Sequence, residues 1–162
     1  MTPTTASEIR DQIISLVSAI IPRSQASSRF RLHREEQPID VFGDAHPDAV
    51  LRLFSVLDLG RYKAPTVSGI DTEWRESTFI VLVGYPATSR AGKGNARSIE
   101  DMINQDGDLI DEAIGLRGFG NFTKSVMMPE SWDRQTLDGE NTRWIRIETT
   151  HGYWRNKSHV PI

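Results

Sequence analysis

The sequence contains no cysteine, and this absence excludes several kinds of chemistry at once. Without a thiol the chain can form no disulfide, no thiolate nucleophile and no thiolate metal site. A protein that folds in a reducing cytoplasm does not need disulfides, so we expect this one to be made there.

Long apolar runs are lacking too. No run approaches the roughly 20 apolar residues that a helix needs to cross a bilayer. The first residues, Met1 to Glu8, have no basic region followed by an apolar core, so we expect no signal peptide. We therefore expect a soluble, intracellular protein with no membrane partner.

Neither sign of charge is in large excess. The chain has 19 Lys and Arg against 22 Asp and Glu, which gives a net charge of -3 and no bulk positive field to attract nucleic acid. Its 162 residues suit one domain, so we expect residues 1–162 to fold as a single unit. The hydrophobic fraction of 38% is slightly low for a core, which is compatible with an oligomer.

Catalytic and metal-binding residue types do not cluster. No two histidines are spaced for a shared metal ion, and no Gly-x-Ser-x-Gly motif marks a nucleophile. We therefore predict that the protein is not an enzyme and has no catalytic residue, no cofactor and no metal site. The histidines are His33, His46, His151 and His159.

Two segments partly match known ligand-binding loops. Ala87 to Gly94 contains a Gly-Lys-Gly sequence, but it lacks the first glycine of a phosphate-binding loop and the Ser or Thr that would hold magnesium. Asn104, Asp106 and Asp108 are spaced like calcium ligands, but Leu109 stands where that loop needs glycine. We interpret the first as a flexible basic surface loop and the second as an acidic, solvated helix face.

The most informative stretch runs from Trp74 to Tyr85. From Phe79 to Val83 every side chain is apolar, so a strand here would have two apolar faces and would need cover on both. The run is short, rich in β-branched and aromatic residues, and bounded by Gly84 and Pro86, which favours a strand over a buried helix. We predict the central strand of a sheet.

Two amphipathic helices are also predicted. Thr5 to Glu8 fits a capping box, and the apolar residues from Ile9 to Ile20 recur at helical spacing before Pro22. In the second, Ser98 is the predicted N-cap, and the apolar residues from Ile99 to Ile114 recur at helical spacing.

The remaining elements are predicted as strands. Alternation around Phe30 and Leu32 predicts an edge strand, and Ala49 to Leu59 is assigned to a strand although a helical stripe also fits it. Ser125 to Met128 and Thr142 to Thr150 predict two more strands, joined by a polar turn region from Asp133 to Asn141. We expect the tail, residues 155–162, to be flexible.

Gly60 to Ser77 predicts a hairpin connection or a pair of long strand extensions, either of which would form an arm that projects from the sheet. The expected fold class is therefore α+β, with a mixed, mainly antiparallel sheet packed against two helices and a projecting β-hairpin arm. An arm of this length buries little surface on its own subunit, so contact with a neighbouring subunit best explains its order. The candidate subunit-interface residues are Arg61, Tyr62, Lys63 and Trp74.

This order of elements resembles the tail terminator proteins of long-tailed bacteriophages, a tail completion and head–tail joining family. The likeness covers most of the chain from about Glu8 to Thr150 and is one of pattern and spacing. Departures are the longer loops at Pro22 to Pro47 and Pro86 to Arg97 and the tail after Thr150. The segments that carry it are Asp48-Ala-Val-Leu-Arg-Leu-Phe-Ser-Val56, Glu73-Trp-Arg-Glu-Ser-Thr-Phe-Ile-Val-Leu-Val-Gly-Tyr-Pro-Ala87 leading into Ser98-Ile-Glu-Asp-Met102, and Thr142-Arg-Trp-Ile-Arg-Ile-Glu-Thr-Thr150.

The resemblance implies a structural virion protein at the junction of tail and neck, assembled in the host cytoplasm. Its partners would be five further copies in a hexameric ring, the tail tube protein, and a head–tail connector or stopper protein. DNA would pass through the ring without specific binding, and the family implies no catalytic residues. The alternatives are another neck or tail component, such as a head-completion or tube protein, and a small nucleotide-binding enzyme that uses Gly92 to Gly94.

Overall fold

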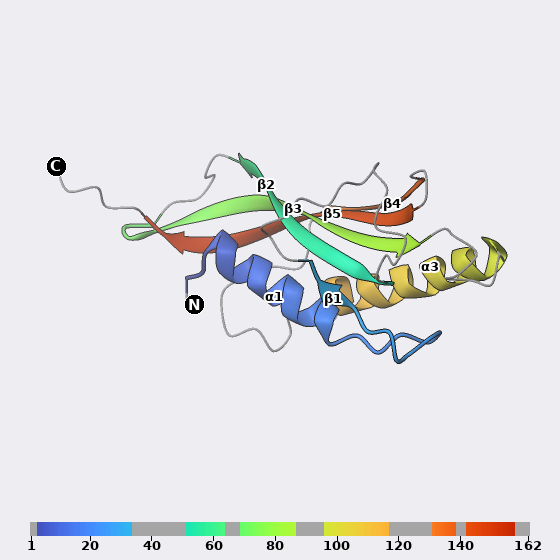
Figure 1. Cartoon of the computed structure of the whole chain (residues 1–162). Coiled ribbons are helices and arrows are strands. Elements are labelled where there is room, and N and C mark those ends of the chain that lie inside the picture. Colours follow the sequence, from blue (N-terminus) through green and yellow to red (C-terminus); the bar gives the residue numbers. More distant parts are fainter. Residues whose placement is uncertain are drawn as a thin grey trace.

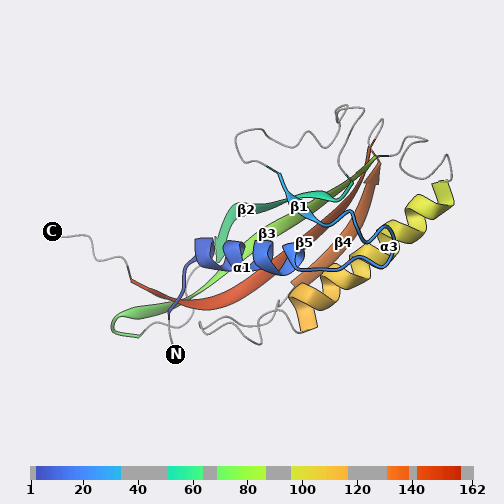
Figure 2. The ribbon, with the colours of Figure 1, turned by 60° about the horizontal axis from the view of Figure 1, so that its bottom comes forward.

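The computed structural model describes residues 3–33, 51–63, 69–86, 96–116, 131–138 and 142–157. Five strands form one sheet, and two helices lie against one of its faces, which we call the inner face (Figures 1 and 2). This is the α+β fold that the sequence predicts. The elements are α1 (Ala6–Ser18), β1 (Arg31–Leu32), β2 (Leu53–Lys63), β3 (Thr72–Pro86), α3 (Ala96–Asp111), the π-helical turn η1 (Glu112–Leu116), β4 (Ser131–Asp138) and β5 (Thr142–Asn156).

The strands lie in the order β1-β2-β3-β5-β4. Only β1 and β2 are parallel, and the other neighbours pair antiparallel, so the sheet is mixed and mainly antiparallel as expected. The two 15-residue strands, β3 and β5, pair along their whole length, from Thr72 opposite Asn156 to Pro86 opposite Thr142. They form the frame on which the rest of the sheet is built.

The prediction of a central strand with two buried faces is confirmed in β3. Phe79, Val81 and Val83 face the helices and belong to the main core. Ile80 and Leu82 point to the opposite, outer face, where they pack in a smaller cluster with Trp144. The helices fill the main core with Ile9, Ile13 and Val17 from α1 and Ile99, Met102, Ile103 and Ile110 from α3.

Helix α1 begins as the capping signal predicts. Thr5 is the N-cap, and its hydroxyl accepts a hydrogen bond from the Glu8 amide at 3.2 Å. The Glu8 carboxylate in turn accepts one from the Thr4 hydroxyl at 3.0 Å. Among the described residues, neither helix is long and apolar enough to cross a membrane.

The predicted start of the second helix is wrong. Helix α3 begins at Ala96, so Ser98 lies inside the helix and is not the N-cap. Alanine and arginine are strong helix formers, so Ala96 and Arg97 extend the helix beyond the serine.

Two predictions at the C-terminal end need correction, and a third is not tested. Asp133 to Asp138, expected in a turn, belong to β4, because a strand at the edge of a sheet tolerates polar side chains. Arg155 and Asn156, expected in a flexible tail, pair with β3. The strand predicted at Ser125 to Met128 lies outside the described residues.

The projecting hairpin is not confirmed. Strand β2 pairs with β3 as far as Lys63 opposite Glu76, with a register shift between Asp58 and Tyr62. Residues 72–75 of β3 pair with β5, and these two strands extend together to the left in Figure 1. Residues 64–68, the middle of the predicted arm, lie outside the described residues.

Candidate functional site

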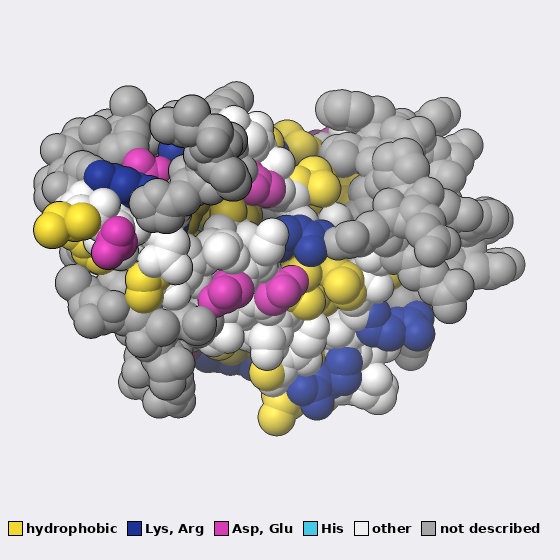
Figure 3. Space-filling view, turned by 90° about the vertical axis from the view of Figure 1, so that its left-hand side faces the viewer, with side chains coloured by type: hydrophobic (Ala, Val, Ile, Leu, Met, Phe, Trp, Pro, Cys, Tyr) yellow, Lys and Arg dark blue, Asp and Glu magenta, His cyan; other side chains and the backbone are white. Residues whose placement is uncertain are grey.

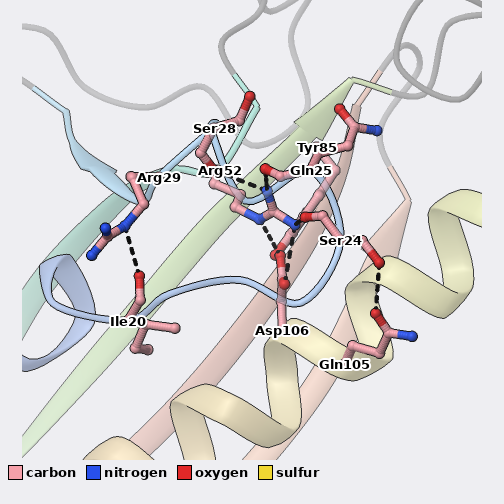
Figure 4. Close-up of polar contacts among 9 residues, drawn as sticks. All are labelled: Ile20, Ser24, Gln25, Ser28, Arg29, Arg52, Tyr85, Gln105 and Asp106. Carbon is pink, nitrogen blue, oxygen red and sulfur yellow. Dashed lines mark hydrogen bonds and ion pairs between the residues drawn. The ribbon is translucent and has the colours of Figure 1, made fainter.

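The most extensive polar cluster in the described core is built around Arg52, which immediately precedes β2. Its backbone is left-handed (φ 63°), a conformation that non-glycine residues rarely adopt. Two main-chain hydrogen bonds hold it, because its N–H donates to the carbonyl of Gly84 at 3.0 Å and its carbonyl accepts from Arg31 at 3.1 Å. The side chain is fully buried and points toward α3 (Figure 4).

The Arg52 guanidinium uses all of its donors within the chain. Nε donates to Asp106 at 2.6 Å, and Nη2 donates to Asp106 at 3.3 Å and to the Ser24 carbonyl at 2.6 Å. Nη1 donates to the carbonyls of Gln25 at 3.0 Å and Ser28 at 2.9 Å. An arginine has five N–H donors, so none remains for a ligand in this arrangement.

Tyr85 completes the cluster from β3. Its hydroxyl donates to Asp106 Oδ2 at 2.6 Å. Burial, and next the negative charge of Asp106, raise the pKa of Tyr85 well above its ordinary value. Tyr85 therefore remains a protonated donor at neutral pH. The Phe30 ring lies 5.8 Å from Arg52 Cζ and covers the guanidinium with an aromatic face.

This cluster joins four segments that are far apart in the sequence. They are the loop after α1 (residues 24–28), the start of β2, the end of β3 and the middle of α3. Ser24 also donates to Gln105 of α3 at 2.8 Å (Figure 4). The arrangement fixes α3 relative to the sheet, and its chemistry is that of a structural ion pair.

The sequence interpretation of Asp106 as part of a solvated face is wrong, because Asp106 is fully buried. The spacing of Asp106 relative to the apolar residues of the helix indicates this burial. Asp106 follows Ile99 by seven residues and precedes Ile110 by four, which places it in the apolar stripe of α3. Arg52, between Leu51 and Leu53, gave a similar signal, since a charged side chain in an apolar segment needs a buried partner.

The predicted interface residues are only partly described. The backbone of Arg61, Tyr62 and Lys63 lies in β2, with Tyr62 opposite Ser77. The structure does not describe the side chains of these three residues. Trp74 is half-buried and packs edge-on against Trp154 of its own sheet, with ring centroids 5.6 Å apart. A side chain at Gly152 would collide with the Trp74 ring. The interface role of all four residues stays a prediction.

The end of the sheet that carries Trp74 shows mixed chemistry. In the described surface of Figure 3, hydrophobic, acidic and basic side chains are interspersed, and no patch of one kind dominates. Glu73 forms ion pairs with Arg75 at 3.3 Å and Arg155 at 3.1 Å, and Ile70 is 91% exposed.

The two loop-like motifs have different outcomes. Ala87 to Gly94 lies outside the described residues. In the calcium-like motif, Asp106 is committed to Arg52 and Tyr85, while Asn104 and Asp108 are exposed. In the part of the chain that the structure describes, no group of three or more His, Asp or Glu side chains is arranged to hold a metal ion.

Comparison of the chain with protein-family models and with curated proteins finds no match.

Proposed function

We propose that the protein is a structural virion subunit that resembles phage tail terminators. In this proposal six copies form a ring that caps the finished tail tube, ends tail polymerisation and presents the docking surface for the head. The observation that carries the proposal is the arrangement of elements: α1 and the acidic helix α3 lie on the same face of a mixed sheet closed by the β4–β5 hairpin.

The Arg52 cluster supports a structural role over a catalytic one. A catalytic site needs a polar group within reach of a substrate atom. The donors of Arg52 are all used internally, and the Tyr85 hydroxyl is committed to Asp106 in the interior. The cluster therefore contributes to the shape of the subunit, which is what a ring-forming protein requires.

The decisive test is assembly. Light scattering of the purified chain should give a mass six times that of the 18.3 kDa subunit, and electron microscopy should show rings. Added to polymerising tail tube protein from the same phage, the ring should shorten and cap the tubes. A mass of one or two subunits at every concentration, with tube length unaffected, would reject the proposal.

A triple variant tests the predicted interface, with Arg61, Tyr62 and Lys63 all changed to serine. We expect a cooperatively folded subunit that does not form rings. The matched control is Arg31→Ser on the exposed edge strand β1, which should assemble normally. Rings formed equally well by the triple variant would reject these three contacts while leaving the ring itself standing.

A further inference from the structure

The two edges of the sheet are protected to different degrees. At the β2 edge, β1 pairs with Leu53 and Phe54, and the Arg10 side chain from α1 donates to the next outward carbonyl, that of Val56, at 2.8 Å. The register shift between Asp58 and Tyr62 then interrupts the strand. Cover, a charged side chain and a bulge are the devices by which proteins prevent an edge strand from pairing with another chain.

In the described part of the chain, the β4 edge has no covering strand and no bulge, and its charged residues are Asp133, Arg134 and Asp138. Strand β4 pairs with β5 over eight successive residues, from Ser131 opposite Thr150 to Asp138 opposite Arg143, with no shift in register. It contains no proline and no lysine. In the part of the chain that the structure describes, no strand lies beyond it, and residues 133–136 are exposed.

The outward main-chain groups of β4 can be identified from the pairing. The carbonyl of Trp154 accepts from Thr4 on the side away from β3, so the even-numbered residues of β5 point their main-chain groups toward β4. Their partners in β4 are odd-numbered. The even-numbered residues, including Arg134, Thr136 and Asp138, therefore direct their N–H and C=O groups outward, away from β5.

The side chains of these same residues lie on the face that carries α3. Arg134 donates to Asp108 at 3.0 Å and to Asp111 at 2.6 Å, and Arg143 donates to Glu100 at 2.8 Å and to Asp138 at 2.8 Å. Four carboxylates thus share two arginines. The side chains of Glu100, Asp108 and Asp138 are 55%, 71% and 74% exposed, so the surface beside the edge is acidic and accessible.

We infer that β4 is a docking edge for an extended segment of a partner protein that carries Lys or Arg at alternate positions. The segment would add to the sheet by main-chain hydrogen bonds with Thr136 and its even-numbered neighbours. Its basic side chains, every second residue, would face the carboxylates of Glu100, Asp108 and Asp138. This inference stands on the edge alone and does not depend on the ring.

Charge also decides against a second copy of this chain as the occupant. Two β4 strands paired antiparallel about a two-fold axis would keep the helices on one face and bring two acidic α3 surfaces together. Like charges in an interface oppose association. A basic segment is attracted instead, because it supplies cations to a surface where four carboxylates face only two arginines.

The test uses fluorescent peptides and the intact chain. An alternating Lys-Val octapeptide should bind, as measured by anisotropy, at least tenfold more tightly than its Glu-Val counterpart, and salt should weaken its binding. Thr136→Pro, which removes an outward N–H, should reduce binding at least tenfold, whereas Thr136→Val should not. The double variant Glu100→Gln, Asp108→Asn should reduce binding severalfold.

A peptide-side control guards against misfolding of the proline variant. The same Lys-Val peptide, N-methylated at alternate residues, cannot complete the ladder and should fail to bind the unchanged protein. Equal binding of the Lys-Val and Glu-Val peptides, or undiminished binding of the methylated peptide, would overturn the inference. So would a doubling of mass in the peptide-free protein that Thr136→Pro abolishes, since it would assign the edge to a second copy.

Discussion

Two arginines hold α3 to the sheet from opposite sides, and they differ mainly in burial. Arg52 and Asp106 are both fully buried, with Nε and Oδ2 2.6 Å apart. Arg134 binds Asp111 at the same distance, but the two side chains are 30% and 34% exposed. Both contacts are arginine–carboxylate ion pairs, but Arg52 also donates to three backbone carbonyls and Asp106 also accepts from Tyr85. The comparison shows how burial in a saturated polar cluster changes the role of an ion pair.

For the buried pair, the largest loss of stability is expected when one partner is removed and the other stays buried without a counter-ion. Burying two charges is expensive, and their attraction roughly offsets that expense only while both are present. The exposed pair pays little desolvation and gains little, because water and salt screen it. We therefore expect the Arg52 cluster to control the stability of the fold, and Arg134 to adjust it only slightly.

The largest effect is predicted for Asp106→Ala. It leaves the Arg52 guanidinium buried without its counter-ion and removes the acceptor of Tyr85, so the free energy of unfolding should fall by about 3–5 kcal/mol. The measurement is urea-induced unfolding of the wild type and the variant. Asp108→Ala, two residues further along the same helix and exposed, is the matched control and should cost less than about 1 kcal/mol. Similar losses in the two variants would remove the distinction between the pairs.

The Arg52 cluster also shows where sequence reasoning stops. The Arg52–Asp106 pair joins residues 54 positions apart, and no local pattern reports a contact of that range. The burial of Asp106 could be predicted from its place in the apolar stripe of α3. The identity of its partner, Arg52, could not be predicted, because the sequence does not show which arginine lies opposite that stripe. The calcium-like spacing includes Asp106, but Asp106 binds Arg52 and Tyr85 rather than a metal ion.

Elements with a clear apolar period were predicted well. The stripe of Ile9, Ile13 and Val17 predicts α1, and the two-faced run in β3 predicts the centre of the sheet, because burial repeats with the geometry of each element. Strand β4 has no such period, since its described side chains are nearly all exposed and polar. The edge inferred to bind a partner is thus the element that hydrophobic patterning reveals least.

A smaller effect is predicted for Tyr85→Phe, which deletes one hydrogen bond to a charged acceptor and keeps the ring. Bonds of this kind contribute about 1.5–3 kcal/mol, so the free energy of unfolding should fall by about that amount at pH 8. The folded-state pKa of Tyr85 is raised above the unfolded value near 10, so its contribution is complete below pH 10. It is lost as the pH rises through the folded pKa.

The difference between wild type and Tyr85→Phe should therefore be smaller at pH 11 than at pH 8. Urea unfolding at the two pH values measures it, and other titrating groups cancel because both proteins carry them. A difference that is unchanged or larger at pH 11 would mean that the Tyr85 hydroxyl is not held in its protonated form by burial and Asp106.

The smallest effect concerns Gly107, which lies in α3 beneath the exposed arginine. A Cβ at this position would lie 2.9 Å from Arg134 Nη1, so the glycine makes room for the guanidinium. Alanine is better than glycine in a helix by about 1 kcal/mol. In Gly107→Ala this gain is offset by displacement of Arg134 from Asp108 and Asp111, so we expect a net change within about 0.5 kcal/mol.

In an Arg134→Ala background nothing opposes the gain, and Gly107→Ala should stabilise the protein by about 1 kcal/mol. The double-mutant cycle, measured by urea unfolding, thus yields the coupling free energy between position 107 and Arg134, which is the cost of displacing the guanidinium. A coupling of several kcal/mol would place Arg134 in the same class as Arg52 and erase the contrast between buried and exposed pairs.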